Sequence, residues 1–190
     1  MTPDLPPLVA QANDRADVAG FVLSSEPGVG ALLAAMAAAV PPRGRILELG
    51  TGAGVGLAWL VHGLGSRDDV ELITVDTNAQ MQSQVQQTMW PVPVSFVLGD
   101  GAVVANQLGR FHLIFADAPG GKIVKLQRTI DALEPGGVLV VDDMELSLHD
   151  HDPPLRDALA LVRERLLSND RLVCAELDFS SGVVVAVKRH

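Results

Sequence analysis

A glycine-rich segment, Glu48-Leu-Gly50-Thr-Gly52-Ala-Gly54-Val-Gly56, is the part of the sequence best suited to hold a ligand. It lies between an apolar run that is typical of a strand and a run that is typical of a helix. At such a junction glycines let backbone amides approach a ligand, and the helix dipole can help to bind it. The dinucleotide fingerprint G-x-G-x-x-G is not matched, because Val55 or Leu57 stands where the third glycine is required. A nicotinamide cofactor is therefore disfavoured, and no Gly-Lys-Ser/Thr follows that would indicate a P-loop.

Acidic residues follow the next three expected strands. Asp76 comes directly after residues 71–75, Asp100 comes shortly after 94–98, and Asp117 follows 112–116. The carboxyl ends of parallel strands meet at one edge of a sheet, which is where doubly wound sheets bind ligands. Each acid taken alone is equally well explained as a cap for the helix that follows it. Their joint order together with the glycine turn predicts a ligand crevice at this edge.

The elements that must position these side chains alternate in type along the chain. Five strand-like runs each precede a helix-like run, and this alternation predicts a parallel sheet with helices on both faces. Two further strand-like runs are joined by only five residues, too few for a crossover helix, so they must pair antiparallel. The expected strands are 45–49, 71–75, 94–98, 112–116, 138–141, 172–177 and 183–187, and the expected crossover helices are 55–64, 78–89, 101–108, 123–133 and 154–167.

Composition and charge limit the function classes. The chain has 190 residues, a formal net charge of −9 and no basic run, which argues against a nucleic-acid or anionic-membrane partner. One domain over residues 1–190 is expected. Three prolines among the first seven residues favour a flexible arm over 1–13, with the first helix beginning at about Asp14. The single cysteine and the lack of a secretory leader favour a cytoplasmic protein. The longest apolar run, residues 27–42, is too short for a bilayer and is expected to form a buried helix.

An acid followed by G-x-G-x-G after the first strand resembles motif I of class I S-adenosylmethionine-dependent methyltransferases. The resemblance implies a Rossmann-like α/β fold with a mostly parallel seven-stranded sheet, strand order 3-2-1-4-5-7-6 and an antiparallel C-terminal strand. It implies that Asp76 accepts from the ribose hydroxyls of S-adenosylmethionine, that Asp100 lies near the adenine amino group and that Asp117 lies near the methionine end. The cofactor-binding residues implied in this way are Glu48, Gly50, Thr51, Gly52, Gly54, Asp76, Thr77, Gly99, Asp100, Gly101 and Asp117.

Within that superfamily the sequence is most similar to the small O-methyltransferases of the catechol and caffeoyl-coenzyme A type. Ser24-Ser-Glu-Pro-Gly-Val-Gly30 resembles their S-P-E-x-G segment. In those enzymes an acid after the fourth strand and an acid-asparagine pair after the fifth hold a divalent cation that bridges two substrate oxygens. The matching residues are Asp117, Asp142 and Asp143, with aspartate where asparagine is usual. Such an oxygen-only set favours Mg²⁺, Ca²⁺ or Mn²⁺. The alternative, held equal, is that Asp117 fixes only the ammonium group of the cofactor while Asp142 and Asp143 begin and cap a loop.

The candidate catalytic residues are Asp117, Lys122, His149 and His151. The catechol-type enzymes place a lysine three residues after the fourth-strand acid, whereas Lys122 stands five residues after Asp117. The alternative to a catalytic role is that Lys122 is solvated and that His149 and His151 belong to an exposed polar loop. Histidine titrates near neutral pH, which suits it to act as a base.

The expected function is transfer of a methyl group from S-adenosylmethionine to a small-molecule acceptor, in first place a hydroxyl oxygen, with a divalent metal as an optional aid. A non-catalytic S-adenosylmethionine-binding module is the alternative that the altered lysine spacing keeps open, and a nicotinamide-dependent oxidoreductase is a weaker one. The apolar helix over 28–40 and the resemblance favour a homodimer. The sequence does not identify the acceptor.

Overall fold

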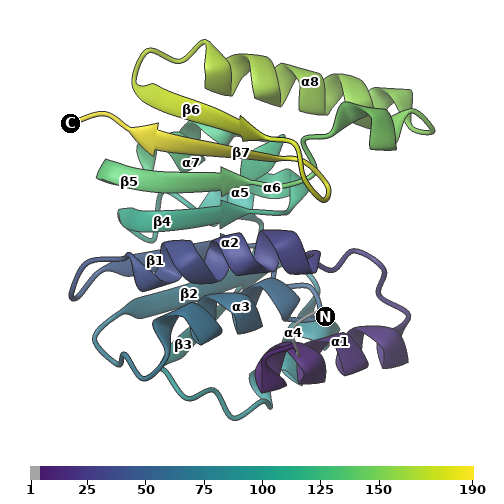
Figure 1. Ribbon diagram of the computed structural model, residues 1–190, viewed down its shortest axis with the longest axis vertical. Coiled ribbons are helices and arrows are strands. Elements are labelled where there is room, and N and C mark those ends of the chain that lie inside the picture. Colours follow the sequence, from purple (N-terminus) through teal and green to yellow (C-terminus); the bar gives the residue numbers. More distant parts are fainter. Residues whose placement is uncertain (1–4) are drawn as a thin grey trace.

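The computed structural model describes residues 5–190, which form one seven-stranded sheet with helices on both faces (Figure 1). The strand order is β3-β2-β1-β4-β5-β7-β6. β7 pairs antiparallel with both β5 and β6, and the other neighbouring pairs are parallel, so the expected order and the antiparallel strand are confirmed. The strands are β1 (Arg45–Leu49), β2 (Glu71–Asp76), β3 (Val94–Leu98), β4 (Phe111–Ala116), β5 (Leu133–Val141), β6 (Leu172–Leu177) and β7 (Val183–Lys188).

The central strands are apolar on both faces because helices cover both. In β4, Leu113 and Phe115 face one hydrophobic core, while Ile114 and Ala116 face the other. All four side chains are buried. This double burial explains why the strands appear in the sequence as nearly continuous apolar runs.

Two groups of helices build these cores. α1 (Pro7–Ala19), α2 (Pro27–Ala38) and α3 (Val55–Leu64) lie over the β1–β4 region, in front of the sheet in Figure 1. α5 (Gly101–Val104), α7 (Leu126–Asp131) and α8 (Pro153–Leu167) contribute to the opposite core. Three short elements complete the order: α4 (Ala79–Gln86) beside β3, α6 (Pro119–Lys122), and a 3₁₀ turn, η1 (Leu146–His149).

The expected flexible arm is wrong for residues 7–13, which form the first turns of α1; residues 1–4 lie outside the described part. Pro7 stands in the first helical turn, where its missing N–H leaves no hydrogen bond unmade. Val9, Ala12 and Ala16 are buried at helical spacing against the core. The prolines thus begin a helix at Pro7 instead of delaying it to Asp14.

The expected helix over 123–133 is also wrong in part. In this region only α7 is helical, and Leu133 already belongs to β5. Lys125 (φ 64°), directly before α7, and Gly121 (φ 93°), within the preceding α6, adopt left-handed conformations that prevent one continuous helix. The loop after β4 is consequently compact and folds back toward β5.

α2 is covered by its own chain. Val29, Leu33 and Ala37 are buried against α3 and the sheet, while the exposed positions of its central turns, Ala31 and Ala35, are small. The apolar composition of α2 is therefore accounted for by packing within the chain. None of the helices in residues 5–190 has both the length and the apolar character needed to span a bilayer.

Candidate active site

The loops that follow β1, β2, β3, β4 and β5 meet at the carboxyl edge of the sheet, together with the α1–α2 connection (Figure 1). Three neighbouring cavities open there. A central cavity of about 190 Å³ shares Asp76 and Thr77 with a β3-side cavity of about 240 Å³. It shares Ser24 and Asp117 with a β5-side cavity of about 470 Å³. The three cavities therefore form one continuous crevice along the edge.

The glycine turn forms one wall of the central cavity. Gly52 adopts a φ of 49°, and a Cβ built there would lie 2.8 Å from the ring of Phe21. Any larger residue would be strained by the backbone and blocked by the ring. Glycine at position 52 is thus required for this shape, whether or not a ligand is bound.

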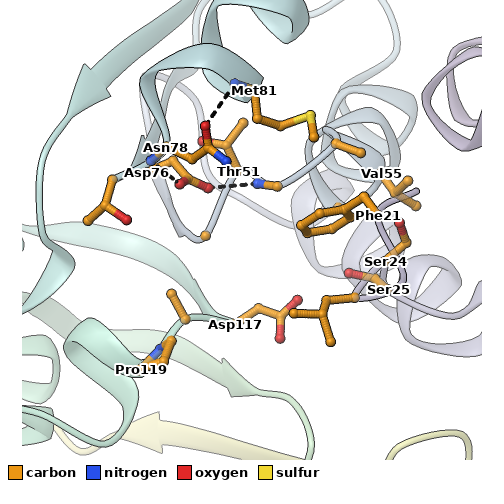
Figure 2. Close-up of a pocket in the computed structure, with 17 residues that line it drawn as sticks. Phe21, Ser24, Ser25, Thr51, Val55, Asp76, Asn78, Met81, Asp117 and Pro119 are labelled. Atoms are coloured by element: carbon orange, nitrogen blue, oxygen red, sulfur yellow. Dashed lines mark hydrogen bonds between the residues drawn. The ribbon is translucent and has the colours of Figure 1, made fainter. Parts of the chain in front are cut away.

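Asp76 fixes the glycine turn (Figure 2). One carboxylate oxygen accepts a hydrogen bond from the Gly52 N–H at 2.8 Å, and the other accepts from the Asn78 N–H at 2.8 Å. Each carboxylate oxygen can accept a second hydrogen bond. The side chain can therefore hold the loop and a hydroxyl-bearing ligand together.

Glu48 lies beneath the glycine turn, outside the residues that line the central cavity. The hydroxyl of Thr74 donates to its Oε2 at 2.5 Å, and Thr51 in turn contacts Thr74 at 2.6 Å. Oε1 has no hydrogen-bond partner within residues 5–190. Burial raises the pKa of Glu48 well above its ordinary value, and the nearby charges of Asp117 and Asp76 raise the pKa further. Burial therefore disfavours the charged form of this acid, which supports the turn from below.

The β3-side cavity collects most of the remaining residues expected at the cofactor. Gly99, Asp100, Gly101 and Thr77 line it. Asp100 also caps α5, because its Oδ1 accepts from the Ala102 N–H at 2.8 Å. The capping interpretation and the ligand interpretation of Asp100 are thus compatible, since the carboxylate has a second oxygen.

Lys122 is buried at the β5-side cavity, which is contrary to the solvated alternative. Its Nζ lies 2.7 Å from Asp143 Oδ2, 3.3 Å from the carbonyl oxygen of Asp142 and 3.8 Å from Asp117 Oδ1. The left-handed turn at Gly121 directs this side chain back under the loop. A lysine five residues after the acid therefore reaches the same acid.

The three aspartates do not form a metal site in this arrangement. The ammonium of Lys122 stands between Asp117 and Asp143. Asp142 Oδ1 accepts hydrogen bonds from the Ser181 hydroxyl and from the Asp143 N–H. No group of three or more acidic, histidine or cysteine side chains in residues 5–190 is arranged to hold an ion. The expected set Asp117, Asp142 and Asp143 thus does not fit a divalent cation.

Burial also shifts the titration of two of these acids. It raises the pKa of Asp117 well above its ordinary value, with Lys122 opposing the shift and the other two aspartates adding to it. Burial likewise raises the pKa of Asp142, while the Ser181 hydrogen bond opposes that shift. Within this cluster of three aspartates, the positive charge comes from Lys122.

Both candidate histidines line the β5-side cavity. His149 Nε2 lies 3.2 Å from the carbonyl oxygen of Asp143. Because a carbonyl oxygen can only accept, Nε2 must carry the proton, which leaves a lone pair on Nδ1 of the neutral ring. His149 is thus the better placed base, whereas His151 is exposed.

Several residues at the crevice were not expected from the sequence. Phe21 lines the central cavity, and Ser181 reaches Asp142 from the β6–β7 turn. Arg15 of α1 donates to the Ala53 carbonyl at 2.8 Å and to the Thr88 hydroxyl at 3.0 Å. The spacing of Val9, Ala12 and Ala16 was the one available signal, since it indicates a helix that carries Arg15.

Comparisons with known proteins show which family the chain resembles and which structures share its fold. A family described as a methyltransferase domain matches residues 47–144. A "Putative O-methyltransferase" of Mycolicibacterium smegmatis is 33% identical over 193 residues, covering 95% of this chain and 90% of that protein. The fold is shared with the O-methyltransferase TomG from Streptomyces achromogenes, solved in complex with SAM (TM-score 0.83, 20% identity, 100% of this chain and 93% of that one). It is also shared with a "putative caffeoyl-CoA O-methyltransferase" from Staphylococcus aureus (TM-score 0.72, 16% identity, 95% and 91% covered).

Proposed function

Because the chain belongs to the S-adenosylmethionine-dependent O-methyltransferase family, we propose that its crevice transfers a methyl group to the hydroxyl of a small acceptor held in the β5-side cavity. This assignment replaces the nicotinamide oxidoreductase alternative. The observation that carries it is that the central and β5-side cavities adjoin, because Ser24 and Asp117 line both of them. A ligand in one cavity would therefore meet a ligand in the other beside these two residues.

The residues present fit S-adenosylmethionine. The β3-side cavity would take the adenine beside Asp100, and Asp76 would accept from the ribose diol. The methionine end would lie toward Asp117, which is opposite Asp76 across the central cavity in Figure 2. The Ser24 hydroxyl is buried there without a partner in the described chain, which leaves a polar group free for a ligand. When bound, the cofactor supplies an electrophilic methyl group on its sulfonium sulfur.

The chain's own contribution to the reaction is positioning and removal of one proton. The walls of the β5-side cavity would hold the acceptor oxygen in line with the methyl group, which is the main requirement of a direct displacement. The lone pair on His149 Nδ1 would accept the hydroxyl proton. A divalent ion has no part in this proposed step, because the three aspartates do not fit one.

Calorimetric titration with S-adenosylmethionine and its demethylated product tests the cofactor site, with NADH as the matched negative ligand. Release of the demethylated product on a panel of phenols and other hydroxyl compounds then tests turnover. Binding of the cofactor with no turnover on any acceptor would favour the non-catalytic module. Failure to bind the cofactor would contradict the proposed function itself.

Other expectations remain predictions. A homodimer, a cytoplasmic location and the absence of a nucleic-acid partner are consistent with the acidic chain, and α2 adds no support for a dimer because its apolar face is already covered. Light scattering on the purified protein tests the oligomeric state.

A further inference from the structure

A buried cation borders the cavity proposed for the acceptor. The Lys122 side chain is 5% exposed, whereas Asp117 and Asp143, its two partners, are 16% and 42% exposed. A lysine is almost never buried to this degree unless its charge is compensated. The surrounding acids supply that compensation, so the ammonium is held at a fixed place in the cavity wall.

The donors of this ammonium are only partly used. A lysine ammonium carries three N–H groups. One donates to Asp143 Oδ2 at 2.7 Å and one to the Asp142 carbonyl at 3.3 Å. Within the described residues the remaining neighbour is Asp117 Oδ1 at 3.8 Å, which is longer than a hydrogen bond. One N–H is therefore available to a ligand in the cavity.

We propose that the Lys122 ammonium is the resident cation of this site: it lies between the Asp117 and Asp143 carboxylates and against the Asp142 carbonyl oxygen, excludes a divalent ion and itself binds the oxygen of the acceptor. This inference rests on the proposed function, because it names what holds the acceptor in that reaction. Lys122 acts only as a hydrogen-bond donor in this step. The hydroxyl proton goes to His149, the acceptor oxygen forms the bond to the methyl carbon, and the electron pair of the broken carbon–sulfur bond stays on sulfur.

The identity of the cation defines the class of acceptor. A divalent ion with several open positions can bind two neighbouring oxygens at once. One free N–H can hold only one oxygen. The rest of the acceptor would meet the apolar side chains of Ile123, Leu148, Leu155 and Leu159 and the polar side chains of Ser25, Glu26 and His151, all of which line the same cavity of about 470 Å³. The acceptor is thus a small molecule that needs only one hydroxyl at Lys122, and a second adjacent hydroxyl gives no advantage there.

Binding of Mn²⁺ tests the inference without any need to know the acceptor. Electron paramagnetic resonance measures free Mn²⁺ in the presence of the wild-type protein and of Lys122→Met, whose side chain has similar length and no charge. We expect the wild type to leave the Mn²⁺ signal unchanged and Lys122→Met to deplete it, because the Asp117 and Asp143 carboxylates then lack their counter-ion. Lys125→Met, at an exposed lysine three residues away, is the control and should resemble the wild type.

Two results would overturn the inference. One is stoichiometric Mn²⁺ binding by the wild type, and the other is no binding by Lys122→Met once its fold is verified by circular dichroism. If Lys122→Met does not fold, Lys122→Gln takes its place, and the wild-type measurement stands in either case. Titration with the demethylated cofactor separates this test from that of the proposed function. If the wild type does not bind the demethylated cofactor, the proposed function is contradicted. The Mn²⁺ measurement does not depend on that result.

Turnover gives a second readout once the assay above has identified an acceptor. Excess EDTA should leave kcat/KM of the wild type unchanged. Lys122→Met should reduce kcat/KM for the acceptor by about ten- to a hundredfold, the loss of one charged hydrogen bond, with cofactor affinity retained. Activity that EDTA abolishes and Mg²⁺ restores would overturn the inference.

Discussion

At the scale of single residues, two carboxyl groups near the glycine turn have different roles because their surroundings differ. Asp76 is partly exposed and accepts two backbone hydrogen bonds from the turn that it faces. Glu48, in β1, is fully buried, and one of its oxygens has no partner within residues 5–190. The first arrangement leaves lone pairs that can accept from ligand hydroxyls, whereas burial in the second disfavours the charged form of the acid.

Asp76→Ala should weaken binding of S-adenosylmethionine and of its demethylated product alike. The variant loses a charged acceptor for the ribose hydroxyls and the anchor of Gly52. We expect a loss of roughly 1.5–3 kcal/mol, or about ten- to a hundredfold in Kd, measured by calorimetry. Asp157→Ala, at an exposed position of α8, is the control. Unchanged affinity in a folded Asp76→Ala protein would place the ribose elsewhere.

Glu48→Gln should change how stability depends on pH. The pKa of Glu48 is raised by folding, so above its ordinary value the unfolded chain loses this proton while the native chain keeps it. The native state of the wild type is therefore progressively disfavoured as pH rises toward the folded pKa. The unfolding free energy of Glu48→Gln minus that of the wild type, from urea denaturation, should become more positive from acid to neutral pH.

The pKa of Asp117 is raised mainly by its own burial, which Glu48→Gln leaves in place, so most of its effect on stability is common to both proteins. A difference that stays constant with pH would show that Glu48 titrates alike in the folded and unfolded chains.

At the scale of elements, α1 supports the glycine turn from outside the sheet. Arg15 joins the turn after β1 to the end of the α4 region through Ala53 and Thr88. The helix that carries it packs on α3, which begins directly after the same turn. The position of the turn thus depends on a helix that precedes the first strand.

Arg15→Ala should weaken cofactor binding although Arg15 does not line the central cavity. Removal of the Ala53 contact loosens the turn, and we expect a cost of about 1 kcal/mol, roughly fivefold in Kd. Arg163→Ala is the matched control, because Arg163 pairs with Glu176 of β6, which is the edge strand at the end of the sheet opposite to β3. Equal affinities for the two variants would show that α1 is a cover for the core without influence on the turn.

At the scale of the whole molecule, ligand binding and stability are linked. A ligand that binds only the folded chain stabilises it by about 2.7 kcal/mol at a concentration of a hundred times Kd. The demethylated cofactor at that concentration should therefore raise the unfolding free energy of the wild type by about this amount in a urea titration.

Gly52→Val should abolish this increase, because its Cβ would meet Phe21 and its backbone would be strained. The unfolding free energy of Gly52→Val must be measured with and without the demethylated cofactor, since the strain also lowers the stability of the variant alone. A full increase of stability in Gly52→Val would show that the turn is a bend that the cofactor does not approach.

Sequence patterns alone predicted most of the elements and their order along the chain. Strands at Arg45–Leu49, Val94–Leu98 and Leu172–Leu177 agree with the runs expected from pattern alone, because apolar content, glycine turns and capping residues are local signals. The acids at strand ends were likewise visible, since a parallel sheet brings all such ends to one edge. The expected arm over 7–13 failed because proline permits a helical first turn as well as an extended chain.

Only the tertiary structure decided which side chains meet. Lys122 reaches Asp143 across 21 residues, Arg15 reaches Ala53 across 38, and Ser181 reaches Asp142 across 39. Such contacts depend on loop conformations, among them the left-handed residues Gly121 and Asp143, that packing against the sheet selects and no local pattern encodes. The sequence therefore supplied three aspartates suited to a metal, and the fold placed a lysine among them because the loop after β4 turns back into the crevice.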